Sequence, residues 1–205
     1  MMISYREEVK RKLIHLSSLW MPTAMVLLPR RPLCIALTVL LVLNLLVEHA
    51  RANRVRIITP LYDFFFGRML RQEPEPGAWI VSGGPYVFAS AALTLALFAP
   101  PAAPAAMAVM LLGDTAAALI GRRFGKHKAW NGKSWEGVAA FLVAGFLGAS
   151  LFLALCGAPA VLYLWALIGV FPAAAAELFE KQLRLDDNFS IPLVMGLALT
   201  IPAWL

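Results

Sequence analysis

The chain has 205 residues, of which 60% are hydrophobic and 15% are charged, and its formal net charge is +6. Soluble domains carry about 25% charged residues, so this composition excludes an ordinary soluble protein. The length leaves no room for a separate soluble domain beside the apolar segments, and we expect residues 1–205 to form a single transmembrane domain. We interpret the basic charge as a signal of membrane topology, and we expect no nucleic-acid partner.

Apolar stretches predict an all-α integral membrane protein built as a bundle of about seven transmembrane helices. The stretches cover residues 13–28, 33–47, 79–98, 102–121, 138–156, 160–176 and 191–205. The first follows four basic residues but has no small-residue cleavage site after it, so we expect a retained helix rather than a removed signal peptide. The second is short for a bilayer of about 30 Å, and we expect its helix to continue toward Arg51.

The distribution of basic residues predicts the orientation. Sixteen of the eighteen Lys and Arg residues fall on one side, and only Arg30 and Arg31 fall on the other. Since cytoplasmic loops retain basic residues, we expect the N-terminus inside and the C-terminus outside a multi-pass protein of the cell (inner or plasma) membrane. All twelve acidic residues also map to the inner side or to helices that lead from it. Acidic residues do not set topology, so their clustering predicts an active site that faces the cytoplasm.

Residues 60–70 combine aromatic side chains with Asp63 and Arg68. This apolar stretch is too short to span, and aromatic rings favour the headgroup zone, so we expect an interfacial segment. Two interpretations stay open: a helix that rests on the membrane, or a lip over a lipid entrance.

Asp114 lies inside the apolar stretch 102–121, eight residues before Arg122. At 1.5 Å per residue it is about 12 Å along the helix from that basic end. Ionisable groups at such depth usually mark an ion or substrate site. Asp114 is therefore predicted to bind a metal, with a buried ion pair to a neighbouring helix as the alternative.

The following segment, 121–137, contains five basic residues and four glycines. Glycines allow close approach of the backbone to an anion, and basic side chains neutralise phosphate, so the pattern favours polyphosphate binding. It is not a Walker A loop, because the position that needs glycine is His127. The alternative is that these charges only reflect topology.

A third polar cluster occupies residues 176–192. Glu177 and Glu180 share one helix face, and Asp187 with Asn188 opens the last helix. Oxygen ligands from several helices beside a basic glycine-rich loop suit Mg²⁺ with substrate phosphates. The simpler interpretation is a Glu177–Lys181 helix pair with Asn188 as an N-cap.

The order of these pieces resembles the CTP-dependent lipid kinases, which include dolichol kinase, phytol kinase, polyprenol kinase and CTP-dependent diacylglycerol kinase. The resemblance covers nearly the whole chain. It is carried by Arg11-Lys12 with His15, Glu48 with Arg51, 84–86, 113–126, 132–137, Glu177, and Asp187-Asn188 followed by Pro192. It implies transfer of the CTP γ-phosphate to the hydroxyl of a membrane lipid alcohol, with Mg²⁺ or another divalent cation.

The resemblance, together with the needs of phosphoryl transfer, assigns roles to these positions. The predicted metal ligands are Asp114, Asp187 and Asn188. The predicted nucleotide contacts are Arg122, Arg123, Lys126, Lys133, Ser134 and Asn188. The predicted catalytic residues are Asp114, Lys133, Glu136 and Glu177.

Two other functions remain open. One is a CDP-lipid-forming cytidylyltransferase, in which the nucleotide is attacked at its α-phosphate. The other is a small ion-coupled transporter that uses Asp114, although the outer halves of the helices carry almost no polar residues. The lipid also stays open, since isoprenoid alcohols and diacylglycerol both present a hydroxyl on an apolar tail, and the sequence leaves the oligomeric state open.

Overall fold

The computed structural model describes residues 4–66 and 82–203, and within these ranges the regular elements are helices. Four helical segments are long and apolar enough to cross a membrane: α3 (Arg30–Ala52), Ala102–Phe124, α8 (Trp135–Leu155) and α9 (Ala160–Leu178). Two shorter helices, α5 (Gly83–Leu97) and α11 (Asp187–Thr200), pack among them. The prediction of a helical membrane protein is confirmed at this level.

The N-terminal segment differs from the single helix predicted over 13–28. It forms two helices, α1 (Tyr5–Ser17) and α2 (Trp20–Leu27), separated by a short break. Pro22 explains the break, because it has no backbone N–H and its ring would clash with the carbonyl group of Ser18 in a continuous helix. The polar helix α1 is thereby set apart from the apolar helix α2.

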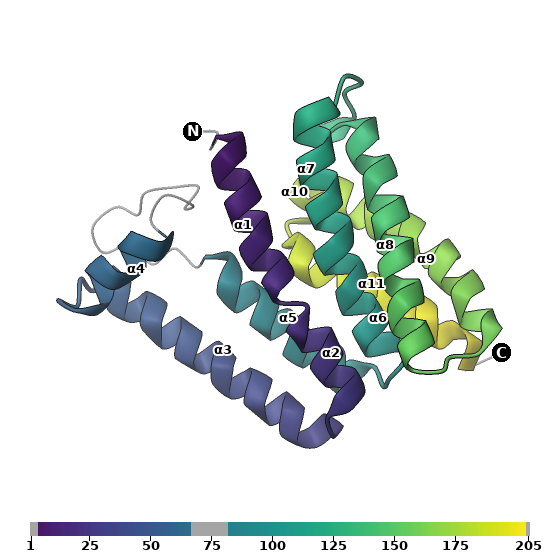
Figure 1. Ribbon diagram of the computed structural model, residues 1–205, viewed down its shortest axis with the longest axis horizontal. Coiled ribbons are helices and arrows are strands. Elements are labelled where there is room, and N and C mark those ends of the chain that lie inside the picture. The colour runs from purple at the N-terminus through teal and green to yellow at the C-terminus, as the bar shows by residue number, and fades with distance from the viewer. Residues whose placement is uncertain (1–3, 67–81, 204–205) are drawn as a thin grey trace.

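Helix α3 runs on to Ala52, as expected from the short second stretch. Helix α4 (Ile58–Phe66) covers the first part of the predicted interfacial segment. The remainder of that segment and residues 79–81 of the third predicted span lie outside the described residues. Figure 1 shows α3 and α4 at one edge of the molecule, where α3 packs mainly along α5.

The centre of the fold is the segment Ala102–Phe124, which comprises α6 (Ala102–Ala108), a π-helical turn (Val109–Gly113) and α7 (Asp114–Phe124). In its most apolar stretch 72% of the residues are buried, against 17% in α3. Small alanine side chains allow neighbouring helices to approach it closely. The π-turn inserts an extra residue directly before Asp114, and such turns are frequent at functional sites.

The C-terminal half completes the bundle around this segment. Helix α8 packs between α7 and α9, α11 packs along α9, and the short helix α10 (Glu180–Leu183) follows α9 and contacts it (Figure 1). The remaining pieces are two 3₁₀ turns, Trp130–Gly132 and Ile201–Ala203. Asp186 caps α11 by accepting a hydrogen bond from the Asn188 N–H at 3.0 Å, so the alternative interpretation of Asn188 as the N-cap was wrong.

Candidate functional site

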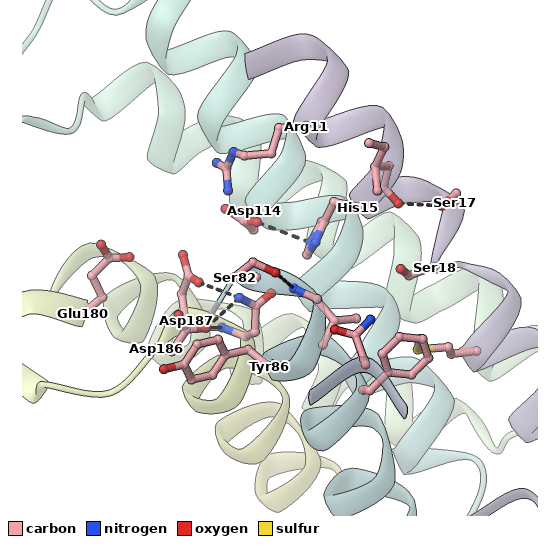
Figure 2. Close-up of a pocket in the computed structure, with 18 of the residues that line it drawn as sticks. Arg11, His15, Ser17, Ser18, Ser82, Tyr86, Asp114, Glu180, Asp186 and Asp187 are labelled. Atoms are coloured by element: carbon pink, nitrogen blue, oxygen red, sulfur yellow. Dashed lines mark hydrogen bonds and ion pairs between the residues drawn. The ribbon is translucent and has the colours of Figure 1, made fainter. Parts of the chain in front are cut away.

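Two cavities meet beside α7. The wide cavity, of about 830 Å³, lies among α1, α2, α3, α5 and the start of α11. The loop cavity, of about 660 Å³, lies among α1, α7, the 125–134 loop and the end of α9. Four side chains line both cavities, and we call them the junction residues: Arg11, Asp114, Glu180 and Asp187. Figure 2 shows Arg11 and Asp114 on one side of the wide cavity, with Glu180 and Asp187 on the other.

Asp114 is held by helix α1. Its Oδ2 atom forms an ion pair with Nζ of Lys12. Figure 2 shows its second neighbour, His15, whose Nε2 lies 3.4 Å from the same oxygen. The Lys12 side chain is only 2% exposed and that of Asp114 is 10% exposed. The structure therefore shows the buried ion pair that the sequence left as the alternative. The predicted metal role of Asp114 stays a prediction.

A second α1 carboxylate fixes two arginines. Glu8 is buried and accepts hydrogen bonds from Nε of Arg11 at 3.2 Å and from Nη1 of Arg122 at 3.0 Å. This holds Arg122, a predicted nucleotide contact, at the lining of the loop cavity. Two ion pairs thus bind helix α1 to α7: Lys12 with Asp114, and Glu8 with Arg122.

Lys133, on the opposite wall of the loop cavity, bridges to the end of α9. Its Nζ lies 2.7 Å from Oε1 of Glu177 and 3.3 Å from Oε2 of Glu180, and it also donates to the Glu177 carbonyl group. Burial alone would lower the pKa of Lys133, but Glu177, Glu180 and Asp187 together more than compensate and raise it. The partner of Glu177 is therefore Lys133, and not Lys181 as in the alternative interpretation of the sequence.

The loop that carries Lys133 is fixed at several points. Ser134 is buried, caps α8 by accepting from the Gly137 N–H at 3.2 Å, and lines the loop cavity; its predicted contact with a nucleotide stays a prediction. A Cβ atom at Gly125 would overlap the Gly121 carbonyl oxygen, so only glycine fits there. The Asn131 amide donates to Gln182 at 2.7 Å and accepts from it at 2.9 Å.

Three predicted residues do not line either cavity: Arg123, Lys126 and Glu136. Glu136 accepts hydrogen bonds from the backbone N–H of Lys126 at 3.1 Å and from Nδ1 of His127 at 2.7 Å. The Arg123 guanidinium lies 5.4 Å from the ring centre of Phe124. In this geometry Glu136 organises the loop backbone instead of reaching the junction, because the first turn of α8 points it toward residues 126–127.

Asp187 and Asn188 line the wide cavity together with Asp114, and the metal role predicted for the three residues stays a prediction. The Asn188 amide donates to Oδ1 of Asp186 at 2.6 Å and to Oδ1 of Asp187 at 3.3 Å. Its Oδ1 atom is buried and accepts no hydrogen bond from any residue the structure describes. That free oxygen suits a cation or a hydroxyl group.

A metal at this position would need further ligands. Within residues 4–66 and 82–203, no group of three or more His, Cys, Asp or Glu side chains is placed to hold one. Magnesium usually takes one or two carboxylates and completes its shell with water and substrate phosphates. The residues present fit a cation that arrives with a polyphosphate.

A separate polar cluster fixes the far side of the wide cavity. Glu48 is buried and accepts hydrogen bonds from the N–H and hydroxyl of Ser82, with the Tyr62 hydroxyl at 3.4 Å. Arg51 pairs with Asp63 at 2.7 Å and lies over the Tyr62 ring. These bonds join α3, α4 and α5, so Glu48 and Arg51 position the cavity wall.

The sequence did not single out two of the junction residues, Arg11 and Glu180, for a role in the site. The signal for Arg11 was its position on the same α1 face as His15, and that for Glu180 was its spacing from Glu177. Asn44 of α3, which also lines the wide cavity, was missed altogether. A lone amide within an apolar helix is the signal that could have found it.

Comparisons with known proteins identify no family. No family model matches the chain, and no solved structure matches it. The chain is similar to an uncharacterized protein of Rickettsia prowazekii (strain Madrid E), with 28% identity over 194 residues that cover 95% of this chain and 94% of that protein. The similarity extends over nearly the whole of both chains.

Proposed function

We propose that this protein is a CTP-dependent kinase that transfers the γ-phosphate of CTP to the hydroxyl of a membrane lipid alcohol. The observation that carries the proposal is the meeting of two different cavities at Asp114, Asp187, Arg11 and Glu180. Two substrates could approach the same polar side chains from two sides. The choice of CTP as donor rests on the resemblance of the sequence motifs.

The loop cavity suits the nucleotide. Arg11, Arg122, Lys128 and Lys133 line it, and its floor includes glycines at 121, 125 and 137. Cations bound to phosphate oxygens and backbone that can come close to them are the usual means of holding a polyphosphate. Lys133 would exchange its longer contact, with Glu180, for a phosphate oxygen.

The wide cavity suits the lipid. Besides its polar groups, this cavity is lined by apolar side chains from α1, α2 and α5. These apolar side chains are Ile14, Trp20, Met21, Val87 and Phe88. Exposed aliphatic side chains cover much of α3, which borders this cavity. A lipid could therefore keep its tail among apolar side chains while its hydroxyl group reaches Asp114 and Asn188.

The reaction is an in-line displacement at phosphorus. The alcohol oxygen forms a bond with the γ-phosphorus, the bond from that phosphorus to the β,γ-bridging oxygen breaks, and CDP leaves. The hydroxyl proton passes to a carboxylate at the junction, where Asp114 and Asp187 face both cavities. A divalent cation held by Asp187, Asn188 and Asp114 would neutralise phosphate charge.

Membrane orientation is part of the proposal. The loop cavity and its basic residues belong on the cytoplasmic side, where CTP is available, with the N-terminus inside. A cysteine introduced beside Arg123 should react only with reagents that enter the cytoplasm. Labelling of that cysteine from outside in sealed cells would overturn the orientation.

The direct test is incubation of purified protein with γ-labelled CTP or ATP, Mg²⁺ and a panel of lipid alcohols. The proposal expects labelled phospholipid and released CDP. The matching lipid phosphates are tested as acceptors in parallel, because release of pyrophosphate with formation of a CDP-lipid from them would instead identify a cytidylyltransferase. No nucleotide turnover with any lipid would contradict both enzymes.

A further inference from the structure

Asn44 of α3 is a polar side chain in an otherwise apolar region. It is seven residues before Arg51, so it lies about 10 Å along the helix from that basic end. Asp114 lies at a similar distance, about 12 Å, from Arg122. Both residues line the wide cavity, Asn44 from α3 and Asp114 from α7.

The Asn44 amide lies against the first turn of α5. A Cβ atom at Gly84 would lie 3.3 Å from Oδ1 and 3.4 Å from Nδ2 of Asn44, which is tighter than most contacts of this kind. Glycine at 84 therefore allows the amide to rest on the first turn of α5. Nearby, Ser82 is already bound to Glu48, so it is not free to satisfy the amide.

The amide has unused hydrogen-bonding capacity. Asn44 forms no hydrogen bond with any residue in the described part of the chain. An amide in an apolar setting is costly unless it is paired, and intramembrane polar groups usually mark a substrate path. Its Nδ2 group donates two hydrogen bonds, so the ligand that satisfies it must offer an acceptor oxygen.

We infer that the wide cavity binds a glycerolipid alcohol, with an ester carbonyl of the lipid accepting a hydrogen bond from Asn44 while the free hydroxyl lies at the junction. This inference rests on the proposed kinase function and names its substrate class. A diacylglycerol has two ester carbonyls beside its hydroxyl. An isoprenoid alcohol has one oxygen, which the junction uses, and its hydrocarbon chain would leave the Asn44 amide unpaired.

The test compares three acceptors: a diacylglycerol, the matching dialkyl ether glycerol and a monohydroxyl isoprenoid alcohol. The ether has the same hydroxyl and tails but no carbonyl group. The variant is Asn44→Leu. The control is Thr38→Val on the same helix, because the Thr38 hydroxyl already donates to the Cys34 carbonyl at 2.8 Å and does not line the cavity. Both turnover and lipid binding are measured, the latter as thermal stabilisation in detergent.

Wild type and Thr38→Val should favour diacylglycerol over the ether by roughly five- to tenfold in kcat/KM, the size of one hydrogen bond. Asn44→Leu should lose that preference while turning over the ether as wild type does. The inference would be overturned if Asn44→Leu lowered kcat/KM equally with all three acceptors, or if the wild-type protein preferred the isoprenoid alcohol. Either result would still be consistent with the proposed kinase function. Preferential binding of diacylglycerol without phosphorylation would support the cavity assignment and refute the kinase. If diacylglycerol is neither bound preferentially nor phosphorylated, and no other acceptor is phosphorylated, the inference and the proposed kinase function are both refuted.

Discussion

Two lysine–carboxylate pairs stand on opposite walls of the loop cavity, and they differ in burial. Lys12 with Asp114 lies inside the helix bundle, where the two side chains are 2% and 10% exposed. Lys133 with Glu177 and Glu180 lies at the edge, where the lysine is 24% exposed. Water can reach Lys133 and solvate it if one of its carboxylate partners is lost, whereas the more deeply buried Lys12 would lose its partner without such solvation.

The difference separates a fixed charge from an exchangeable one. Breaking a buried pair leaves a stranded charge, so Lys12 is bound to Asp114 whether or not a ligand is present. Lys133 can give up Glu180 for a phosphate oxygen with little loss, since exposed ion pairs contribute little. Under the proposed function, Lys12 of α1 belongs to the framework of the site and Lys133 of the 125–134 loop belongs to substrate binding.

The largest expected effect is that of Asp114→Asn. This change strands the buried Lys12 ammonium and should lower the free energy of unfolding by about 3–5 kcal/mol. Thermal unfolding in detergent measures it. The double variant Lys12→Met, Asp114→Asn removes the stranded charge and should recover most of the stability. An Asp114→Asn protein as stable as wild type would show that the pair does not hold α1 to α7.

Lys133→Ala should affect binding more than folding. It removes one charge-assisted contact to phosphate, so CTP affinity should fall by about 1.5–3 kcal/mol, with little change in lipid affinity. Titration of CTP against purified protein measures this. Lys10→Ala is the matched control, because Lys10 pairs with Glu7 at the surface and lines neither cavity. Unchanged CTP affinity in Lys133→Ala would remove this residue from the nucleotide site.

Gln182→Ala should loosen the loop without touching its charges. It deletes the two amide hydrogen bonds to Asn131, 2.7 and 2.9 Å long. The expected loss of CTP affinity is about 1 kcal/mol, because neutral hydrogen bonds contribute on that order. A loss as large as that of Lys133→Ala would mean that the amide pair, rather than the lysine, determines nucleotide binding.

The smallest effect is a dependence of stability on high pH. Because the pKa of Lys133 is raised in the folded protein, its contribution to stability is fully present below its ordinary pKa of 10.5. The contribution is lost as pH rises through the folded value. The stability difference between wild type and Lys133→Met should therefore be constant up to about pH 10 and shrink above it. A difference that grows with pH would contradict the assignment of Lys133 as the charged partner.

The sequence alone predicted a helical membrane protein, and among the four junction residues it singled out Asp114 and Asp187. Apolar stretches determine membrane helices because no other local structure satisfies the backbone in lipid. A carboxylate such as Asp114 stands out in an apolar helix because placing a charged group inside a membrane costs free energy. Lys133 and Ser134, which line the loop cavity, were singled out for a similarly local reason, since glycine-rich basic segments are visible in the order of residues.

What only the tertiary structure decided is which of these groups face one another. The break at Ser18 directs α1 toward α7, so Lys12 meets Asp114 across 102 positions of sequence. The end of α9 brings Glu177 to Lys133 rather than to the neighbouring Lys181, and Glu136 turns to its own loop. Asn44 reaches the wide cavity because Gly84 leaves space for it. Charge and polarity are properties of single residues, whereas pairing depends on distances that helix packing sets, and for that reason the composition could predict a polar site but not its partners.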